Sequence, residues 1–347
     1  MLKKVLAIET SCDDTSVALV GSDGWVYQLY SASQDKDHEV FGGIVPEIAS
    51  RNHSFHLLPL VDKILKNEDW NQIDGIVVTN RPGLVGSLIV GIVTAKTLAQ
   101  TKGKPFLGIN HLEGHLLAPF LRDDQYQPQF THDKPFVALA ISGGHTSLYQ
   151  VRGLGSYQIL GATRDDAAGE AFDKFAKKIG LGFPGGPRVD HWAKLGNPTA
   201  YSFPRGLMKE ETYDMSFSGL KSAAQRLLDS MSDEEINNHL ADLCASFQRA
   251  VCDVLVHKLD RAVTLTKSDK VVVTGGVSAN SGLRLMAENW AIQKGVQLLI
   301  PPLRYCTDNA AMIGYAGILR MNRGEKSDLQ LGPSPRALPG DFDVSHQ

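Results

Sequence analysis

Two histidines spaced four residues apart are the side chains in this sequence with the clearest capacity for chemistry. They lie in His111-Leu-Glu-Gly-His115, and residues with this spacing share one face of a helix about one turn apart. A carboxylate near that face would complete a facial metal site with open positions for a substrate oxygen, as catalytic metals are held. The alternative is that both imidazoles are exposed or make ordinary hydrogen bonds. A second polar motif, Cys306-Thr-Asp-Asn309, lies far downstream.

The histidine pair resembles the metalloprotease motif His-Glu-x-x-His but differs from it in the position of the acid. In that motif the Glu directly follows the first His and acts as general base. Here Glu113 is two residues after His111, and at about 100° per residue it points away from the metal face. A metallopeptidase is therefore disfavoured.

The composition is that of an ordinary globular protein, with 43% hydrophobic and 21% charged residues among 347. The length allows two domains, because one core rarely exceeds roughly 250 to 300 residues. No apolar run approaches the roughly 20 residues that span a bilayer. The N-terminal sequence has no signal-peptide cleavage region, so we expect a cytoplasmic protein. The four cysteines form no Cys-x-x-Cys pair and are expected to be reduced thiols.

The strand pattern is duplicated within the chain. Residues 5–20 contain a buried strand, a polar turn and a second strand, and residues 137–151 repeat this layout. Each segment predicts a β-hairpin whose turn leaves backbone N–H groups free for an anion. The apolar strands 76–79 and 271–274 each run into a glycine-bearing loop and then a helix. The repeat predicts an α/β protein with two similar lobes, each a mixed sheet flanked by helices.

Two hairpins and a loop at Thr274-Gly-Gly-Val-Ser-Ala-Asn280 resemble the plan of the actin, hexokinase and Hsp70 superfamily. That plan has two lobes of duplicated RNase H-like domains around a central cleft, with the hairpin turns holding phosphate and the late loop holding adenosine. We divide the chain into an N-terminal lobe at 1–121, a polar crossover at 122–134, a C-terminal lobe at 135–311, and a segment at 312–347. This last segment is expected to form a helix returning to the first lobe, followed from about residue 324 by a loose, proline-rich tail.

Nine ordered motifs make the resemblance specific. They are Glu9-Thr-Ser-Cys-Asp-Asp-Thr15, Pro46-Glu-Ile-Ala-Ser-Arg51, Asn110-His-Leu-Glu-Gly-His115, Ser142-Gly-Gly-His-Thr146, Asp166-Ala-Ala-Gly-Glu-Ala-Phe-Asp-Lys174, Pro184-Gly-Gly-Pro187, Phe217-Ser-Gly-Leu-Lys221, Gly275-Gly-Val-Ser-Ala-Asn280 and Cys306-Thr-Asp-Asn309. The chain resembles the TsaD family, relatives of the Kae/OSGEP proteins once labelled O-sialoglycoprotein endopeptidases. The resemblance implies transfer of a threonylcarbamoyl group from threonylcarbamoyl-adenylate to the exocyclic amine of the adenosine next to the anticodon. The acceptors are tRNAs that read codons beginning with A.

The resemblance also implies a ligand set. His111, His115 and Asp308 match the metal ligands of the family, with one Fe²⁺ per subunit the usual ion and zinc the alternative. The division above assigns Asp308 to the C-terminal lobe. Residues that match the positions contacting the phosphate, carbamoyl end, ribose and adenine of the adenylate are Ile141, Ser142, Gly143, Gly144, His145, Thr146, Asp173, Gly186, Asp190 and Asn280.

A mixed anhydride of a carbamate and a phosphate is already activated, so the reaction needs no covalent nucleophile. It needs orientation of a weak amine, stabilisation of developing charge, and removal of a proton. Candidates for the proton are Glu9, Asp13 and His145. Asp13 can instead cap the turn through side-chain to backbone bonds, and His145 can be a fixed donor. We favour Asp13 as a polar catalytic group.

One position departs from the family, which usually has Gly-Pro-Gly-Leu where this chain has Arg81-Pro-Gly-Leu84. If the backbone needs φ > 0 there, Arg81 is strained by about 1 kcal/mol or more. Otherwise Arg81 is free to reach a tRNA phosphate or a partner. A net charge of −3 gives no global attraction to RNA, so the cations expected to contact tRNA are few: Arg51, Arg81, Lys174 and Arg304.

Residues 48–65 and 85–99 predict helices, the second almost entirely apolar or small, which is typical of core or of an interface. The family pairs this lobe with the smaller paralogue TsaB and recruits the ATPase TsaE, while a separate synthase supplies the adenylate. Two further alternatives are a small-molecule kinase of the same superfamily, which would not need the histidine pair, and a noncatalytic module that presents tRNA to other subunits.

Overall fold

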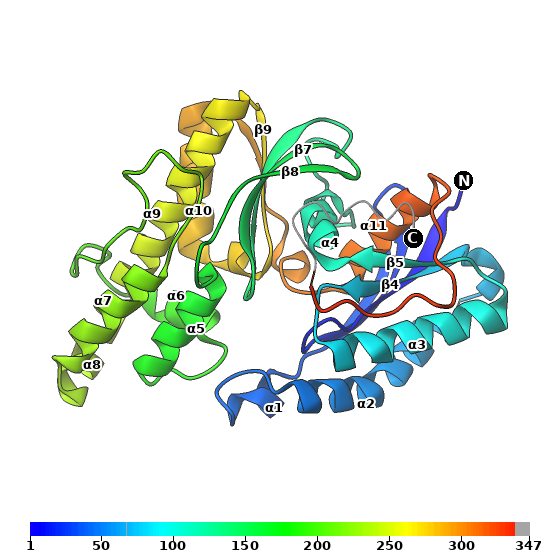
Figure 1. Ribbon diagram of the computed structural model, residues 1–347, viewed down its shortest axis with the longest axis horizontal. Helices are drawn as coiled ribbons and strands as arrows, with labels where there is room; N and C mark the ends of the chain where they lie inside the picture. Colours follow the sequence, from blue (N-terminus) through cyan, green and yellow to red (C-terminus); the bar gives the residue numbers. More distant parts are fainter. Residues whose placement is uncertain (67, 337–347) are drawn as a thin grey trace. The chain divides into compact units, whose positions relative to one another are not determined.

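The computed structural model describes residues 1–66 and 68–336, and these form two units (Figure 1). The first unit comprises Met1–Lys134, Arg152–Tyr157 and Pro301–Gln347, and the second comprises Pro135–Val151 and Gln158–Ile300. This division differs from the sequence-based one, which ends the second lobe at residue 311. Residues 301–336 belong to the first unit because α11 (Ala310–Met321), which lies within them, packs on the first sheet. Asp308 therefore lies in the same unit as His111 and His115.

The first unit is built on a five-stranded mixed sheet. Its strands are β1 (Lys4–Glu9), β2 (Thr15–Gly21), β3 (Val26–Ala32), β4 (Gly75–Arg81) and β5 (Phe106–Asn110). They lie in the order β3-β2-β1-β4-β5. β2 is antiparallel to both β1 and β3, whereas β1, β4 and β5 are mutually parallel. The carboxyl ends of these three parallel strands consequently meet at one edge of the sheet.

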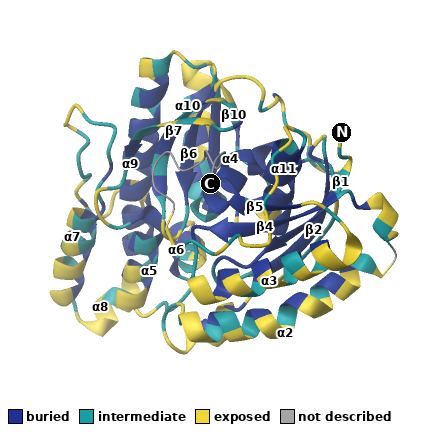
Figure 2. Ribbon diagram, turned by 45° about the vertical axis from the view of Figure 1, so that its right-hand side comes forward, coloured by how far each residue is buried: buried dark blue, intermediate teal, exposed yellow. Residues whose placement is uncertain are grey.

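Helices cover both faces of this sheet. Leu6 and Ile8 of β1 pack in a core with α2 (Pro46–Leu65) and α3 (Val85–Lys102). Side chains alternate along a strand, so the intervening Ala7 faces the other layer, which holds α11 (Ala310–Met321). Figure 2 shows β1, β2, β4 and β5 almost entirely buried, while α2 and α3 carry exposed residues on their outer sides. The short helix α4 (His111–Leu117) lies against α11 and β5. The short α1 (Asp35–Glu39) contacts α2, where Asn52 donates to Asp37 at 2.9 Å.

The second unit repeats the strand order of the first. Its strands are β6 (Phe136–Ile141), β7 (Thr146–Gly153), β8 (Ser156–Ala162), β9 (Lys270–Thr274) and β10 (Gln297–Leu299). Their order is β8-β7-β6-β9-β10, with β6 antiparallel to β7 and parallel to β9, and β9 parallel to β10. Each strand thus has a counterpart in the first sheet, which confirms the predicted duplication and both predicted hairpins.

The core of the second unit is formed by one face of this sheet and a group of helices. The helices are α5 (Ala168–Lys178), α6 (Gly185–Ala193), α7 (Ser218–Asp229), α8 (Asp233–Asn238), α9 (Leu240–Thr266) and α10 (Ser281–Lys294). The long α9 supplies Phe247, whose ring stacks on Phe175 of α5 with centroids 4.0 Å apart. Aromatic packing of this kind fixes α5 and α9 relative to each other within the unit.

Both helices predicted at 48–65 and 85–99 are present as α2 and α3. The C-terminal segment differs from the loose tail expected beyond residue 324. Ser327 N donates to Phe106 O at 2.8 Å, and Ser334 N donates to Asn80 O at 2.9 Å, so this stretch is held against β4 and β5. The remainder of the predicted tail, 337–347, lies outside the described residues. Among the helices of the described ranges, none has the length and apolarity required to cross a membrane.

Candidate active site

The polar residues of the first unit gather where its parallel strands end. Glu9 is the last residue of β1, Thr79 lies near the end of β4, and Asn110 ends β5 directly before α4. All three are buried. Open α/β sheets bind their ligands at the carboxyl ends of parallel strands, so this edge is the candidate site of the first unit.

Two asparagine caps position the candidate ligands. Asn110 caps α4 by accepting a hydrogen bond from Leu112 N at 2.8 Å, which starts the helix at His111 and sets His115 one turn later. Asn309 caps α11 in the same way, accepting from Met312 N at 3.0 Å. Asp308 therefore precedes a fixed helix start rather than lying in a free loop.

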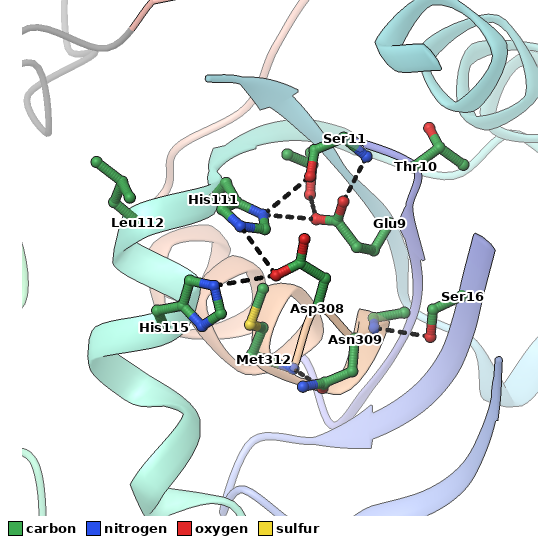
Figure 3. A network of polar contacts seen from close by, with 12 residues as sticks. Glu9, Thr10, Ser11, Ser16, His111, Leu112, His115, Asp308, Asn309 and Met312 are labelled. Atoms are coloured by element: carbon green, nitrogen blue, oxygen red, sulfur yellow. Dashed lines mark hydrogen bonds and ion pairs between the residues drawn. The ribbon is translucent and has the colours of Figure 1, made fainter. Parts of the chain in front are cut away.

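The two imidazoles and the Asp308 carboxylate converge on one point (Figure 3). Asp308 Oδ1 lies 3.3 Å from His111 Nε2 and 3.1 Å from His115 Nε2. The three ligand atoms all lie within 4.8 Å of one another. Ligands about 2.1 Å from a common ion are separated by about 3.0 to 3.4 Å at octahedral or tetrahedral angles, and the two distances from Asp308 to the histidines fall in this range. The cluster can bind a metal, and two histidines with one acid leave coordination positions open.

Glu9 supports this cluster from behind. Its Oε2 lies 3.1 Å from His111 Nδ1 and accepts a hydrogen bond from Thr79 Oγ1, and its Oε1 accepts from Ser11 N at 2.5 Å. A carboxylate on the second ring nitrogen of a ligating histidine orients that ring and leaves Nε2 for the metal. Glu9 was predicted as a candidate proton acceptor. Its three contacts inside the protein fit the role of a support better.

The charges of the cluster alter each member's pKa. Burial opposes ionisation of Asp308, but the charge and hydrogen bonds of His111 and His115 hold its pKa well below its usual range. Burial also disfavours a charged His111, yet Asp308 and Glu9 raise its pKa well above the ordinary value. Burial lowers the pKa of His115. A bound metal would need both imidazoles neutral, a state that the lowered pKa of His115 favours and the raised pKa of His111 opposes.

The hairpin turn between β1 and β2 lies beside the cluster and carries two more acids. Burial, followed by the charge of Asp308, raises the pKa of Asp13. Burial, followed by the charge of Asp13, raises the pKa of Asp14 to about 8. The turn is held from α2 by His53, whose Nδ1 lies 2.8 Å from Thr15 Oγ1 and whose Nε2 lies 3.0 Å from Cys12 O. Asp13 thus combines a fixed backbone with a carboxyl whose pKa is raised by burial and by the charge of Asp308.

Glu113 lies away from the metal cluster, as the helical spacing predicts. Its carboxylate accepts two hydrogen bonds from Arg320, at 2.5 Å and 2.9 Å, and one from the Tyr157 hydroxyl at 2.5 Å. A carboxylate in this ion pair cannot serve as the general base of a peptidase acting at the two histidines. The four cysteines are free thiols, as predicted.

In the second unit the predicted hairpin residues form a tight turn at the end of β6. Ser142 N donates to His145 O at 2.7 Å, and His145 N donates to Ser142 Oγ at 3.1 Å. Thr146 Oγ1 accepts from Ala168 N at 2.9 Å, which ties the hairpin to the start of α5. A Cβ added to Gly143 or Gly144 would meet none of the described atoms within 4 Å, so the outer side of this turn is open.

Two predicted aspartates make hydrogen bonds within this unit. Asp173 Oδ1 accepts from Gly185 N at 2.7 Å at the start of α6. Asp190 accepts from Ser281 N and Oγ at 3.0 Å and 2.8 Å, and pairs with Lys194 at 3.1 Å. Its carboxylate therefore joins α6 to α10, a role that the sequence did not indicate.

Asn280 caps α10 by accepting from Leu283 N at 2.9 Å, and its amide donates to Gln248 Oε1 at 2.7 Å. Gly275, on the same loop, lies so close to β6 that a Cβ there would be 2.7 Å from the Ile141 carbonyl carbon. A Cβ at Gly186 would meet no described atom within 4 Å. The predicted substrate residues therefore surround the carboxyl ends of β6 and β9, with open space at the glycines.

Comparisons with known proteins agree with these arrangements. Residues 26–315 match the TsaD family, described as tRNA N6-adenosine threonylcarbamoyltransferase. The chain belongs to this family. A tRNA N6-adenosine threonylcarbamoyltransferase of Bdellovibrio bacteriovorus is 65% identical over 99% of this chain and 100% of that protein. A protein of the same name from Thermosynechococcus vestitus is 47% identical over 94% and 93% of the two chains.

A structure of full-length HypF in its phosphate- and nucleotide-bound form has a TM-score of 0.59 and 12% identity, covering 93% of this chain and 47% of HypF. At this identity the likeness concerns the fold alone. Together with the repeated strand order, it confirms the predicted α/β fold of the actin, hexokinase and Hsp70 type with duplicated RNase H-like domains.

The TsaD family modifies tRNA, so the state of the four predicted tRNA-contacting cations matters. Arg81 is only 8% exposed and donates to Asn80 Oδ1 at 3.0 Å. It lies in β4 and does not have positive φ, so the strain alternative and the phosphate contact are both disfavoured. Lys174 pairs with Asp166 and Glu170, and Arg304 with Asp123. Arg51 is exposed, and no ion pair is recorded for it among the described residues.

Proposed function

We propose that this protein transfers the threonylcarbamoyl group from L-threonylcarbamoyladenylate to the exocyclic amine of the adenosine next to the anticodon and releases AMP. The acceptors would be tRNAs that read codons beginning with A. The observation that carries the proposal is the convergence of His111, His115 and Asp308 in a chain that matches the TsaD family over residues 26–315. A small-molecule kinase of the same fold would have no use for this cluster.

The metal proposed for these three ligands is one Fe²⁺ per subunit, with zinc as the alternative. Bound there, the ion would act as a Lewis acid and template for substrate oxygens. Glu9 would keep His111 in the tautomer that presents Nε2, and Asp308 would supply the anionic ligand. Asp13 would receive or hold a proton near the reacting groups, since burial keeps its pKa above the ordinary value.

The adenylate is proposed to bind to the second unit. The backbone N–H groups of the turn from Ile141 to Thr146 would hold its phosphate and carbamoyl end, as glycine-rich turns hold anions. Asp173 and Asn280 would accept and donate hydrogen bonds to the ribose and adenine, and Gly186 would let the backbone approach the nucleoside. Asp190 would act through α10 by fixing Ser281 beside Asn280. His145 would serve as a fixed donor in the turn.

We further propose that the first unit binds a TsaB-like paralogue through α2 and α3, with a TsaE-like ATPase recruited and a separate synthase supplying the adenylate. The support is a set of exposed apolar side chains on the outer faces of these helices, namely Phe55, Leu58, Val85, Ile89 and Val93, which are 43% to 64% exposed. Several large apolar side chains exposed on neighbouring helices are typical of protein interfaces. The cytoplasm, where tRNA is modified, is the proposed location.

The test is a transfer assay with this protein, its TsaB-like and TsaE-like partners, threonylcarbamoyl-adenylate and unmodified tRNA, followed by digestion to nucleosides. We expect threonylcarbamoyladenosine and an equal amount of AMP. A matched tRNA with guanosine next to the anticodon should give no product. Release of AMP without modified nucleoside would show that this adenosine is not the acceptor. Phosphorylation of a small molecule by ATP without any transfer would favour the kinase alternative.

A further inference from the structure

Helix α4 carries a buried ion pair on the side opposite its two histidines. Glu113 is two residues from both His111 and His115, so its side chain is turned by about 200° from theirs around the helix. Glu113 is 1% exposed and its partner Arg320 is 7% exposed. The guanidinium meets the carboxylate through Nε and Nη2, at 2.5 Å and 2.9 Å. This fork geometry fixes direction as well as distance.

The pair completes a set of three attachments between α4 and α11. At one end, His111 and His115 meet Asp308 directly before α11. In the middle the two helices touch, because a Cβ on Gly114 would be 2.8 Å from Ile313 Cδ1 and 3.1 Å from Met312 Cγ. At the other end Glu113 meets Arg320, which lies ten residues, about 15 Å of helix, beyond the start of α11 at Ala310.

The attachments matter because α4 is short. It has seven residues, from His111 to Leu117, so its own backbone bonds give it little resistance to rotation or sliding. Contact at one point would leave it free to turn about that point. Three points along a single neighbouring helix fix both its rotation and its depth.

We propose that the Glu113–Arg320 pair is a positioning clamp that sets His111 and His115 against Asp308 and thereby sets the affinity for the metal. The inference rests on the proposed metal site. Glu113 and Arg320 are positioning residues and touch neither the metal nor the substrate.

Energetics favour this role over a purely stabilising one. Burying two charges costs desolvation free energy that their attraction often fails to repay, so an apolar pair of similar volume is commonly as stable or more so. The pair is also reinforced, with Tyr157 donating to Glu113 and Arg320 Nη1 bonded to Glu325 at 2.7 Å. What these bonds provide that apolar packing would not is a defined orientation of α4.

The test uses the double variant Glu113→Gln/Arg320→Met in the full chain, which removes both charges together and leaves neither one buried alone. Metal dissociation constants are measured by competition of Zn²⁺ and Co²⁺ with a chelator, and the visible spectrum of the Co²⁺ form reports ligand geometry. We expect at least about tenfold weaker binding, the lower range for losing groups that orient ligands, with an altered Co²⁺ spectrum. Binding within twofold of wild type and an unchanged spectrum would overturn the clamp.

Two further variants keep the test decisive. Arg320→Lys retains the charge but loses the fork, so it should fold and bind metal with intermediate affinity; wild-type affinity and spectrum there would also overturn the proposal. Asp253→Asn breaks a partly buried ion pair with Arg205 in the second unit and should leave metal binding unchanged. If wild type itself binds no metal, the proposed site fails, and this outcome is distinct from failure of the clamp.

Discussion

The two sheets have the same strand order, but different kinds of residue surround the carboxyl ends of their parallel strands. In each unit the first strand of the sheet ends beside a parallel neighbour, β1 beside β4 and β6 beside β9. Around the first edge lie ionisable side chains, including the buried Glu9 and His111 and the partly buried Asp308. Around the second stand glycine-bearing turns and helix caps, such as the turn after Ile141 and the cap by Asn280.

The contrast fits the different ligands proposed for the two edges. A metal ion is held by side-chain nitrogen and oxygen donors, which must be oriented by further bonds behind them. A nucleotide is held by backbone N–H groups and by close backbone approach, which side chains would block. A shared topology therefore supplies the location, and the local side chains decide the chemistry.

The largest effect should come from removing the donors of the first edge. His111→Ala/His115→Ala leaves only Asp308 of the three candidate ligands, so metal content should fall from about one ion per chain to about none, measured by elemental analysis. Transfer activity should be lost with it. AMP affinity, measured by calorimetry, should stay within about twofold of wild type if the two edges bind independently.

Unchanged metal content in that variant would refute the ligand assignment. If the variant lost AMP affinity together with the metal, the two edges would not bind their ligands independently. Circular dichroism serves as the control for folding, since both histidines are buried.

Much of the first edge could be predicted from sequence. The four-residue spacing of His111 and His115 is a helical pattern, and it also predicted that Glu113 points away. The support by Glu9 could not be foreseen, because nothing local shows that the end of β1 comes beside α4. The pairing of Arg320 with Glu113 could not be predicted either, since it depends on how α11 packs against α4.

A side chain added where the backbone is tightly packed should disturb the second edge. A Cβ at Gly169 would lie 2.6 Å from Ser142 O and 2.8 Å from Gly143 Cα. These are backbone atoms, so Gly169→Ala must displace either α5 or the turn, at a cost of about 1 to 3 kcal/mol in the free energy of unfolding. We expect weaker AMP binding by calorimetry and unchanged metal content.

Gly144→Ala is the matched control, because its Cβ would meet no described atom within 4 Å. It should leave unfolding in urea within about 0.5 kcal/mol of wild type. Equal destabilisation by both substitutions would show that the turn, rather than its packing on α5, is the sensitive element.

For the second edge, motif order predicted which residues assemble but not what each one does. The hairpins and the late loop are local patterns, and the structure has them where expected. Asp190 was expected at the adenylate, and its carboxylate also joins α6 to α10 through Ser281. Such roles depend on contacts between residues about 90 positions apart, which one sequence does not reveal. The held segment 327–334 was missed for the same reason, since polar composition alone suggested a loose tail.

The crowding of acids at the first edge should appear as a pH dependence of stability. The pKa of Asp14 is raised from 3.8 to about 8, so the folded state holds a proton that the unfolded chain releases. This contribution is fully present below about pH 4 and is lost as pH rises to about 8. Asp14→Asn should therefore flatten the decline in unfolding free energy between pH 5 and 8, by at most about 4 kcal/mol.

Urea unfolding at several pH values measures this effect, with the exposed Asp62→Asn as control. A decline that persists unchanged in Asp14→Asn would assign the pH dependence to other groups. Added metal should reduce the wild-type decline, because the charge of Asp308 is one cause of the raised pKa.

The smallest expected effect concerns which of the two units contacts the phosphate backbone of the tRNA. Lys174 of the second unit is engaged by Asp166 and Glu170, whereas Arg51 of the first unit is exposed without a recorded ion pair among the described residues. A cation that neutralises one phosphate contributes about one unit to the slope of log affinity against log salt. Arg51→Gln in the complete assembly should lower that slope by about one, while Lys174→Gln should leave it unchanged. The reverse result would move the phosphate contact to the second unit. A steep slope that neither substitution alters would mean that the partner subunits hold the tRNA.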